Sequence, residues 1–155
     1  MASNETTKPT IYYTSCHKHA LDAQRRVQLP AVWRPATPDE EFTMVLWPKH
    51  AAGKCLRVLP DKQLEKLMAE LDALPNNDPD KVFLKRFIGS NSVRVALDGA
   101  GRICIPAEMK VEAGIGKEVM FVGMLDRFEI WSVERNKLRA DLDAPRASVA
   151  FERME

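Results

Sequence analysis

Alternating hydrophobic and polar positions predict short strands in two separate parts of the chain. Residues 26–29 (RVQL) and 102–105 (RICI) alternate with a period of two, the pattern of a strand with one buried face. A polar turn precedes each strand, and the turn at 98–101 contains glycines that permit a tight reversal. Pro30 and Pro106 end the two strands. The pattern therefore predicts a hairpin-like turn leading into a short strand in each part.

Longer patterns predict the remaining elements and a mixed α+β fold that is mainly β. Apolar runs predict two pairs of strands, at 41–47 with 55–59 and at 117–123 with 127–131. Leucines at helical spacing, with Asp61 as the cap, predict an amphipathic helix at 61–74. Prolines and glycines at their ends delimit further helices at 78–88 and 106–113, and another helix begins near Ser132.

One short motif occurs twice. A shift of 76 positions superposes residues 20–31 on residues 96–107, and both copies read Ala-Leu-Asp-x-x-x-Arg-(Val/Ile)-x-(Leu/Ile)-Pro-Ala. Internal repetition indicates two similar structural units in one chain. The expected organisation is a flexible N-terminal extension at 1–13, a first unit at 14–60, a helical linker at 61–90, a second unit at 91–134, and a C-terminal helix and tail at 135–155 that lacks clear periodicity from residue 141.

Composition and cysteine content exclude several classes of protein. The chain has 155 residues, 45% hydrophobic and 29% charged, which is ordinary for a globular protein and unlike disordered or collagen-like chains. No window approaches the roughly 20 apolar residues of a membrane span, so we expect a cytoplasmic protein with no membrane contact. Three cysteines without a CxxC pair do not predict a disulfide framework.

Charge is segregated along the chain although the formal net charge is only +1. Residues 16–34 contain four cations and one acid, whereas residues 61–81 contain three cations and six acids. A net charge near zero argues against indiscriminate coating of nucleic acid. Binding to nucleic acid therefore requires a local basic patch, and the first motif lies in such a patch.

The repeated aspartate and arginine have two physical interpretations. A planar guanidinium can donate two hydrogen bonds to guanine in the major groove and can also bind phosphate. On this interpretation Arg26 and Arg102 contact DNA, while Asp22 and Asp98 orient them or hold the loop. Alternatively, each Asp-Arg pair is a structural ion pair that stabilises its hairpin. The residues alone leave both interpretations open.

Other candidate chemistry is weaker. Lys18, Arg25 and Arg94 are supporting cations, each of which is individually more typical of a solvated charge than of a phosphate contact. The Cys16-His17-x-His19 segment does not predict a metal site, because strand alternation places Cys16 on the face opposite both histidines. We expect these histidines to flank a DNA-facing surface or to point to water. No nucleophile, metalloprotease or phosphate-loop motif occurs, so the sequence predicts neither an enzyme nor a cofactor nor a small-molecule substrate.

Several motifs in one order resemble the MraZ family of transcriptional regulators, which are tandem AbrB-like proteins. The second copy carries the likeness: Asp98-Gly99-Ala100-Gly101-Arg102 resembles the family's DxxxR signature, and Ile105-Pro106-Ala107 follows it. The runs 116–123 and 127–131 are also similar to the family. The resemblance covers about residues 14–140 and favours Arg26 and Arg102 at DNA.

This resemblance implies the fold, the assembly and the targets. It implies two AbrB-like swapped-hairpin barrel halves that pack as a pseudo-dimer within one chain, linked by two helices. It also implies a ring-shaped homo-oligomer, associated with the nucleoid, that binds short direct repeats upstream of a cell-division and cell-wall gene cluster, usually its own operon. The alternative function is an AbrB-like, antitoxin-like interaction module for which DNA binding is secondary.

The first copy departs from the family pattern at one position. Arg25 stands where glycine usually precedes the motif arginine, whereas Gly101, with Gly99, keeps the second loop glycine-rich. A residue with a side chain at positive φ costs on the order of 1 kcal/mol, so the first turn either differs or is compensated. We favour compensation, with Arg25 contacting phosphate.

Overall fold

The computed structural model describes residues 10–37 and 39–154 and shows a mixed fold that is mainly antiparallel sheet. Its elements in chain order are β1 (Cys16–Ala20), β2 (Arg26–Gln28), a 3-10 turn η1 (Ala31–Trp33), β3 (Glu41–Trp47), β4 (Cys55–Pro60), α1 (Asp61–Asp72), α2 (Pro79–Ser90), β5 (Ser92–Ala96), β6 (Arg102–Cys104), α3 (Ala107–Glu112), β7 (Glu118–Gly123), β8 (Phe128–Ser132) and α4 (Val133–Phe151).

The predicted strands and helices are present, and α4 is longer than the sequence pattern indicates. The helix continues through the segment after residue 141, for which the sequence pattern predicted no clear periodicity, and it contains Pro145. Alanine recurs along this segment, and its high helix propensity favours the helix without an amphipathic pattern. The helix is capped at its start, where the Ser132 hydroxyl accepts a hydrogen bond from the Arg135 amide.

Strand pairing interleaves the two parts of the chain. The six-stranded sheet has the order β1-β7-β8-β4-β3-β5, and β2 pairs with β6 in a separate ribbon. Four pairs, β1 with β7, β2 with β6, β5 with β3 and β8 with β4, each join one motif-bearing part to the other, and every pair is antiparallel. Strands β1, β3 and β4 of the first part correspond to β5, β7 and β8 of the second part. When these counterparts are exchanged, the strand order is the same read from either end.

The register has the same exchange symmetry. Val27 lies opposite Ile103 at the centre of the β2–β6 ribbon, and these residues are counterparts in the two motif copies. At the centre of the β4–β8 pair, Arg57 lies opposite Glu129. Both central pairs therefore lie where the two parts meet symmetrically.

The main hydrophobic core lies between the six-stranded sheet and the β2–β6 ribbon. Trp33, Phe121 and Phe128 are fully buried there, together with the inward residues of the ribbon. The extension predicted at 1–13 falls mostly on residues 1–9, which lie outside the described residues. Of the remainder, Tyr13 is buried in this core, so the packed part of the chain begins before residue 14.

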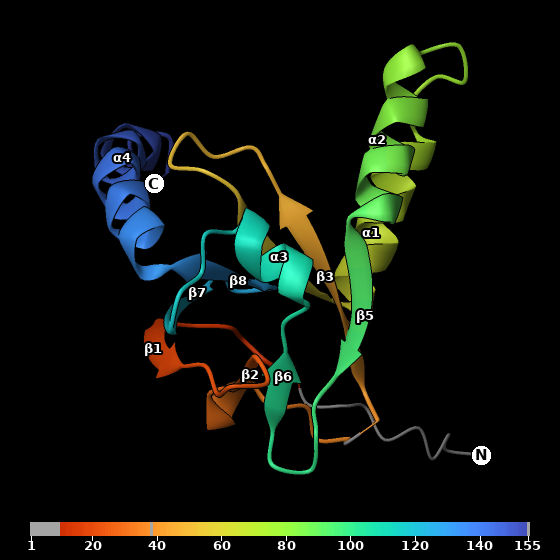
Figure 1. Ribbon diagram of the computed structural model, residues 1–155. Coiled ribbons are helices and arrows are strands. Elements are labelled where there is room, and N and C mark those ends of the chain that lie inside the picture. The colour runs from red at the N-terminus through yellow and green to blue at the C-terminus, as the bar shows by residue number, and fades with distance from the viewer. Residues whose placement is uncertain (1–9, 38, 155) are drawn as a thin grey trace, which may run out of the picture.

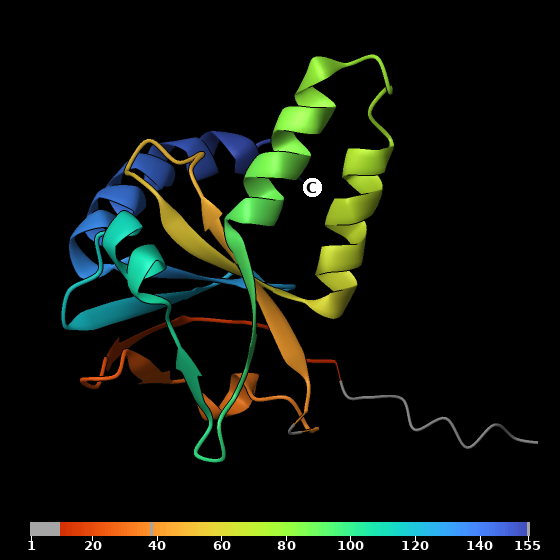
Figure 2. The same ribbon diagram turned by 45° about the vertical axis from the view of Figure 1, so that its right-hand side comes forward.

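Helices α1, α2 and α4 lie away from the β2–β6 ribbon (Figures 1 and 2). Helices α1 and α2 form a hairpin that stands out from the sheet (Figures 1 and 2), and no side chain of α2 is buried. Helix α4 lies beside β7 and β8 (Figure 1). No helix in the described part of the chain is both long and apolar enough to span a membrane. Among the described residues, no α-helix covers the ribbon end.

Candidate nucleic-acid interface

The two motif loops have the same hydrogen-bonded structure. In the first, one carboxylate oxygen of Asp22 accepts bonds from the backbone amides of Gln24 (2.9 Å) and Arg26 (2.8 Å). In the second, Asp98 accepts bonds from Ala100 and Arg102, each at 2.9 Å. A short side chain that accepts amides two and four residues later closes a tight turn. The aspartate of the motif therefore builds the loop.

The second carboxylate oxygen of each aspartate holds the motif arginine. Arg26 Nε donates to Asp22 Oδ2 at 2.7 Å, and Arg102 Nε donates to Asp98 Oδ2 at 2.8 Å. Arg102 also lies 3.7 Å from Asp22 through Nη1, which connects the two loops. Both side chains are about one-third exposed, 35% for Arg26 and 32% for Arg102. Each motif arginine is therefore held by an aspartate at a partly exposed position.

Hydrogen bonding keeps both aspartates ionised. The backbone amide of Arg26 is the largest cause that lowers the pKa of Asp22 below its ordinary value, and the side chain of Arg26 adds to it. The backbone amide of Arg102 lowers the pKa of Asp98 in the same way. Both carboxylates therefore hold their loops as anions at neutral pH.

We expect the loops to loosen only in acid. A carboxyl whose pKa is lowered by folding stabilises the folded state above the unfolded pKa of about 3.9, and this stabilisation is lost as the pH falls through the folded pKa. Carbon-detected NMR titration should place both midpoints below 3.8, the ordinary value. In the variant Arg26→Ala, the Asp22 midpoint should rise while the Asp98 midpoint stays low. Midpoints at or above the ordinary value in the native protein would contradict the assigned hydrogen bonds.

The substitution of Arg25 for glycine does not change the turn. Arg25 has φ +62° and Gly101 has φ +77°, so both loops adopt the left-handed conformation at this position. The side chain of Arg25 turns back to the protein, where Nε donates to the Ile105 carbonyl at 3.0 Å. Within the second loop only Gly101, not Gly99, has a positive φ. The strain at Arg25 is thus offset by a hydrogen bond within the protein.

The other predicted cations lie in two different places. Lys18, on β1, is exposed and 3.9 Å from Glu118. Arg94, on β5, is paired with Glu41 (3.1 Å) and Asp61 (2.7 Å), and the hydrogen bond to Asp61 raises its pKa above the ordinary value. The structure therefore brings Arg25, Arg26 and Arg102 together but ties Arg94 to the acidic start of α1.

The prediction that His17 and His19 flank a DNA-facing surface or point to water stays a prediction. Both residues are half-buried on β1, whose alternation leaves Cys16 and Lys18 exposed. His17 lies edge-on to Trp33 at 5.1 Å and His19 to Phe121 at 5.7 Å. The expected separation of Cys16 from the histidines is confirmed. No cluster of three metal-ligating side chains occurs within residues 10–37 and 39–154.

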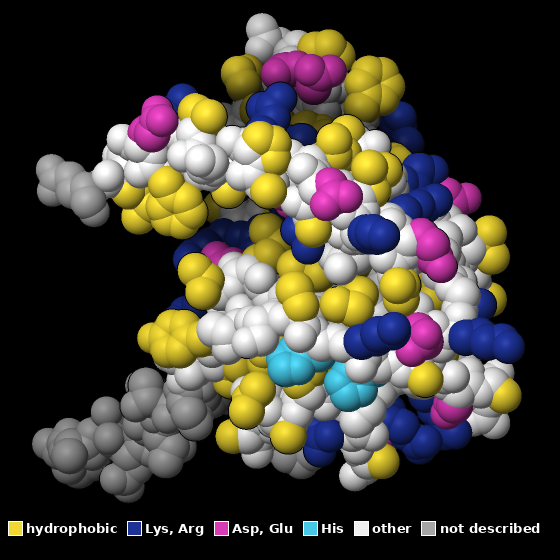
Figure 3. All heavy atoms as spheres, turned by 90° about the vertical axis from the view of Figure 1, so that its left-hand side faces the viewer, with side chains coloured by type: hydrophobic (Ala, Val, Ile, Leu, Met, Phe, Trp, Pro, Cys, Tyr) yellow, Lys and Arg dark blue, Asp and Glu magenta, His cyan; other side chains and the backbone are white. Residues whose placement is uncertain are grey.

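The face of the molecule in Figure 3 carries side chains of both charges. On the face in Figure 3, basic side chains alternate with acidic and apolar ones, and some basic side chains lie at the lower edge, the end that carries the β2–β6 ribbon. Arg34 is the last cation of the basic segment at 16–34 and was not among the predicted site residues. In the structure Arg34 Nε donates to the Leu29 carbonyl at 3.1 Å and its guanidinium lies over Gly101. Only the pairing between the two parts of the chain reveals this position.

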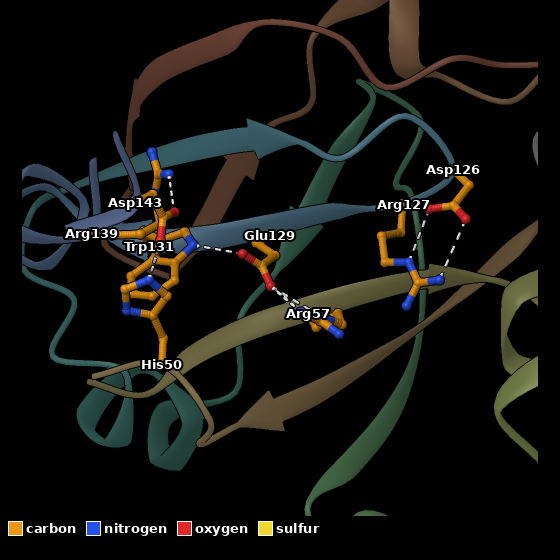
Figure 4. A network of polar contacts seen from close by, with 8 residues as sticks. All are labelled: His50, Arg57, Asp126, Arg127, Glu129, Trp131, Arg139 and Asp143. Carbon is orange, nitrogen blue, oxygen red and sulfur yellow. Dashed lines mark hydrogen bonds and ion pairs between the residues drawn. The ribbon is translucent and has the colours of Figure 1, made fainter. Parts of the chain in front are cut away.

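A second polar network lies on the face of the six-stranded sheet that points away from the main core (Figure 4). Glu129 is buried and accepts bonds from Arg57 (2.9 and 3.0 Å) and from the Trp131 indole (2.9 Å). His50 lies 2.7 Å from Asp143, which also accepts a bond from an arginine of α4. Each carboxylate in this network has partners within the protein, so it fastens β4, β8 and α4 together.

The cavity beside this network has a volume of about 440 Å³ and is lined by residues that include Trp47 and Cys55. Burial raises the pKa of the Cys55 thiol, so the thiol is not ionised at neutral pH. A buried, protonated thiol is a poor nucleophile. Cys55 is therefore not an activated nucleophile.

Comparison with known proteins shows similarity to one family over most of the chain. Residues 88–142 match the family described as "MraZ protein, putative antitoxin-like". The protein named "Transcriptional regulator MraZ" of Leuconostoc citreum is 36% identical over 118 residues, which cover 76% of this chain and 79% of the relative. The protein of the same name from Burkholderia vietnamiensis is 38% identical over 111 residues, covering 72% and 75% of the two chains.

Proposed function

This chain belongs to the MraZ family of transcriptional regulators, and we propose that it regulates transcription by binding double-stranded DNA through its two Asp-x-x-x-Arg loops. The observation that carries the proposal is the matched pair of loops in which an aspartate holds an arginine at the surface. Because Nε is bound by the aspartate, the outer amino groups are presented in a fixed direction. Such a preorganised fork suits recognition of guanine or phosphate.

The two interpretations of the motif are therefore compatible. The ion pair positions the arginine, and the arginine contacts DNA. Side chains held in place by a neighbouring carboxylate lose less entropy on binding than free ones. The first loop, with its additional Arg25, contributes more charge, and the second loop carries the family pattern unchanged. Asp22 and Asp98 are positioning residues, while Arg26, Arg102, Arg25 and Lys18 contact the DNA.

We also infer that the fold is an intrachain pseudo-dimer of two AbrB-like swapped-hairpin halves. The interleaved strand pairs support this, since each half supplies strands to the sheet of the other. The symmetric register supports it too, with an approximate twofold axis through the Val27–Ile103 and Arg57–Glu129 pairs. This axis relates the two motif loops, which together form one surface. A single chain then binds one DNA repeat.

One chain offers few phosphate contacts, so binding requires several chains. We propose a ring-shaped homo-oligomer in the cytoplasm, associated with the nucleoid, whose subunits bind successive short direct repeats. Linked weak sites bind together at high effective concentration when the DNA repeats match their spacing. The targets are direct repeats upstream of a cell-division and cell-wall gene cluster that includes the protein's own gene.

The test of DNA recognition compares two duplexes. Wild-type protein is titrated at physiological salt against the DNA upstream of its own gene and against a scrambled duplex of equal length and composition. We expect roughly a thousandfold preference or more for the upstream DNA. Equal affinity for both duplexes would contradict the proposal and favour the second candidate, an antitoxin-like interaction module, which the family description and the exposed apolar face of α2 support.

The test of assembly uses the exposed face of α2. Phe83 is 62% exposed and Phe87 39%, and apolar area of this kind is typical of a protein contact. Light scattering should give the wild-type protein a mass several times the 17.5 kDa of one chain. The double variant Phe83→Ala, Phe87→Ala should have a smaller mass, whereas Phe151→Ala on α4 should not. A single-chain mass for the wild type would refute the ring.

A further inference from the structure

The two motif loops differ at the residue before the motif arginine, and the structure compensates for the difference. Arg25 and Gly101 occupy equivalent positions, each with positive φ. Each also accepts an equivalent backbone bond, from Ile105 to Arg25 at 2.9 Å and from Leu29 to Gly101 at 3.0 Å. The backbones therefore match, and only the first loop carries a guanidinium at this position.

Arg34 supplies the missing guanidinium to the second loop. Its Nε donates to the Leu29 carbonyl at 3.1 Å, just as Arg25 Nε donates to the Ile105 carbonyl at 3.0 Å. Leu29 and Ile105 are counterparts in the two motif copies, each followed by proline. The two side chains thus make the same contact, although one comes from the loop itself and the other from the residue after η1.

The space over Gly101 is filled by this side chain. A Cβ atom built on Gly101 would lie 2.7 Å from Arg34 Nε and 2.8 Å from its Cζ. Any side chain at position 101 would therefore displace Arg34. The glycine of the second loop is matched to the arginine from the first part of the chain, so the two loops are completed by different residues.

We propose that Arg34 is a further DNA-contacting residue, which binds the phosphate backbone beside the second loop as Arg25 does beside the first. This inference rests on the proposed DNA-binding function. Arg34 is partly exposed, and its side-chain hydrogen bond to another described residue is made by Nε, which leaves the Nη groups as donors. The DNA-binding surface then contains four guanidinium groups in a pseudo-twofold arrangement, with Arg26 and Arg102 as readers and Arg25 and Arg34 as phosphate contacts.

A phosphate contact has a signature that a structural arginine lacks. Removing it weakens binding to every sequence equally. It also lowers the salt slope, which is the slope of log affinity against log salt concentration, by about one. We therefore expect Arg34→Met to reduce affinity about tenfold for both the upstream duplex and the scrambled duplex. The salt slope, measured by fluorescence anisotropy from low to physiological salt, should fall by about one. Arg25→Met should give the same result.

A relocated guanidinium provides the decisive control. In the double variant Gly101→Arg, Arg34→Ala, the second loop is given the arrangement of the first, because the left-handed position accommodates arginine at residue 25. We expect this variant to recover the salt slope and most of the affinity that Arg34→Ala loses.

The outcomes separate this inference from the proposed function. If wild-type protein binds the upstream DNA and Arg34→Met keeps the wild-type salt slope, Arg34 has only a structural role and the inference is overturned. Thermal unfolding of each variant reports that structural role directly. If wild-type protein shows no preference for the upstream DNA, the proposed function itself fails, whatever Arg34 does.

Discussion

The double variant Arg26→Ala, Arg102→Ala is expected to lose its preference for upstream DNA by roughly a hundredfold or more, because each bidentate arginine contributes about 1–3 kcal/mol of discrimination between bases. The fold should persist, since both arginines are partly exposed and the aspartates keep their backbone hydrogen bonds. The measurement is a gel shift against the upstream and scrambled duplexes, with circular dichroism to confirm folding.

Matched controls separate charge from position. Arg146→Ala with Arg153→Ala removes two exposed cations from the far end of the chain and should leave the preference intact. Asp22→Asn with Asp98→Asn keeps both motif arginines but weakens their support, so it should give an intermediate loss. If the double arginine variant binds the upstream DNA as the wild type does, the motif arginines have no role in recognition.

The second large effect concerns the ion pair at the centre of the β4–β8 pair. Glu129→Ala is expected to lower the free energy of unfolding by about 3 kcal/mol, because it leaves the charge of Arg57 without its partner in a largely buried place. The side chains of Arg57 and Glu129 are 17% and 8% exposed. The variant also removes the acceptor of the Trp131 indole. Urea unfolding followed by tryptophan fluorescence measures the change.

An exchange of the two charges tests the pairing itself. In Arg57→Glu, Glu129→Arg the ion pair is restored in the opposite sense, and we expect about half of the lost stability to return, because the Trp131 bond is not restored. Glu152→Ala, at the exposed end of the chain, is the control for loss of one carboxylate. A midpoint for Glu129→Ala equal to that of the wild type would show that the pair contributes nothing.

The local structure of the loops was predictable from sequence because it depends on neighbouring residues. The aspartate accepts hydrogen bonds from the amides two and four residues later, and a strand that ends at proline follows. Together these residues specify the turn and the strand. The same reasoning located β3, β4, β7 and β8 from their apolar runs. It could not extend α4 past residue 141, since helix propensity leaves no periodic signal there.

Contacts between distant segments were beyond local reasoning. The hydrogen bond of Arg25 to Ile105 and the position of Arg34 over Gly101 exist only because β2 and β6 pair across the molecule. The surroundings of His17 also depend on a distant segment, because its ring packs edge-on against Trp33. The acidic partners of Arg94 likewise come from β3 and α1. The sequence identified the cations, but only the strand pairing shows which of them lie at the motif loops and which are paired with acids elsewhere.

The Arg57–Glu129 pair also bears on how a duplicated chain evolves. In a dimer of identical subunits, a residue on the twofold axis faces its own copy, so a charge there would be repelled. In this single chain the two facing positions carry different residues, so opposite charges can pair there. The two positions are therefore not interchangeable, because the same residue at both would bury two like charges.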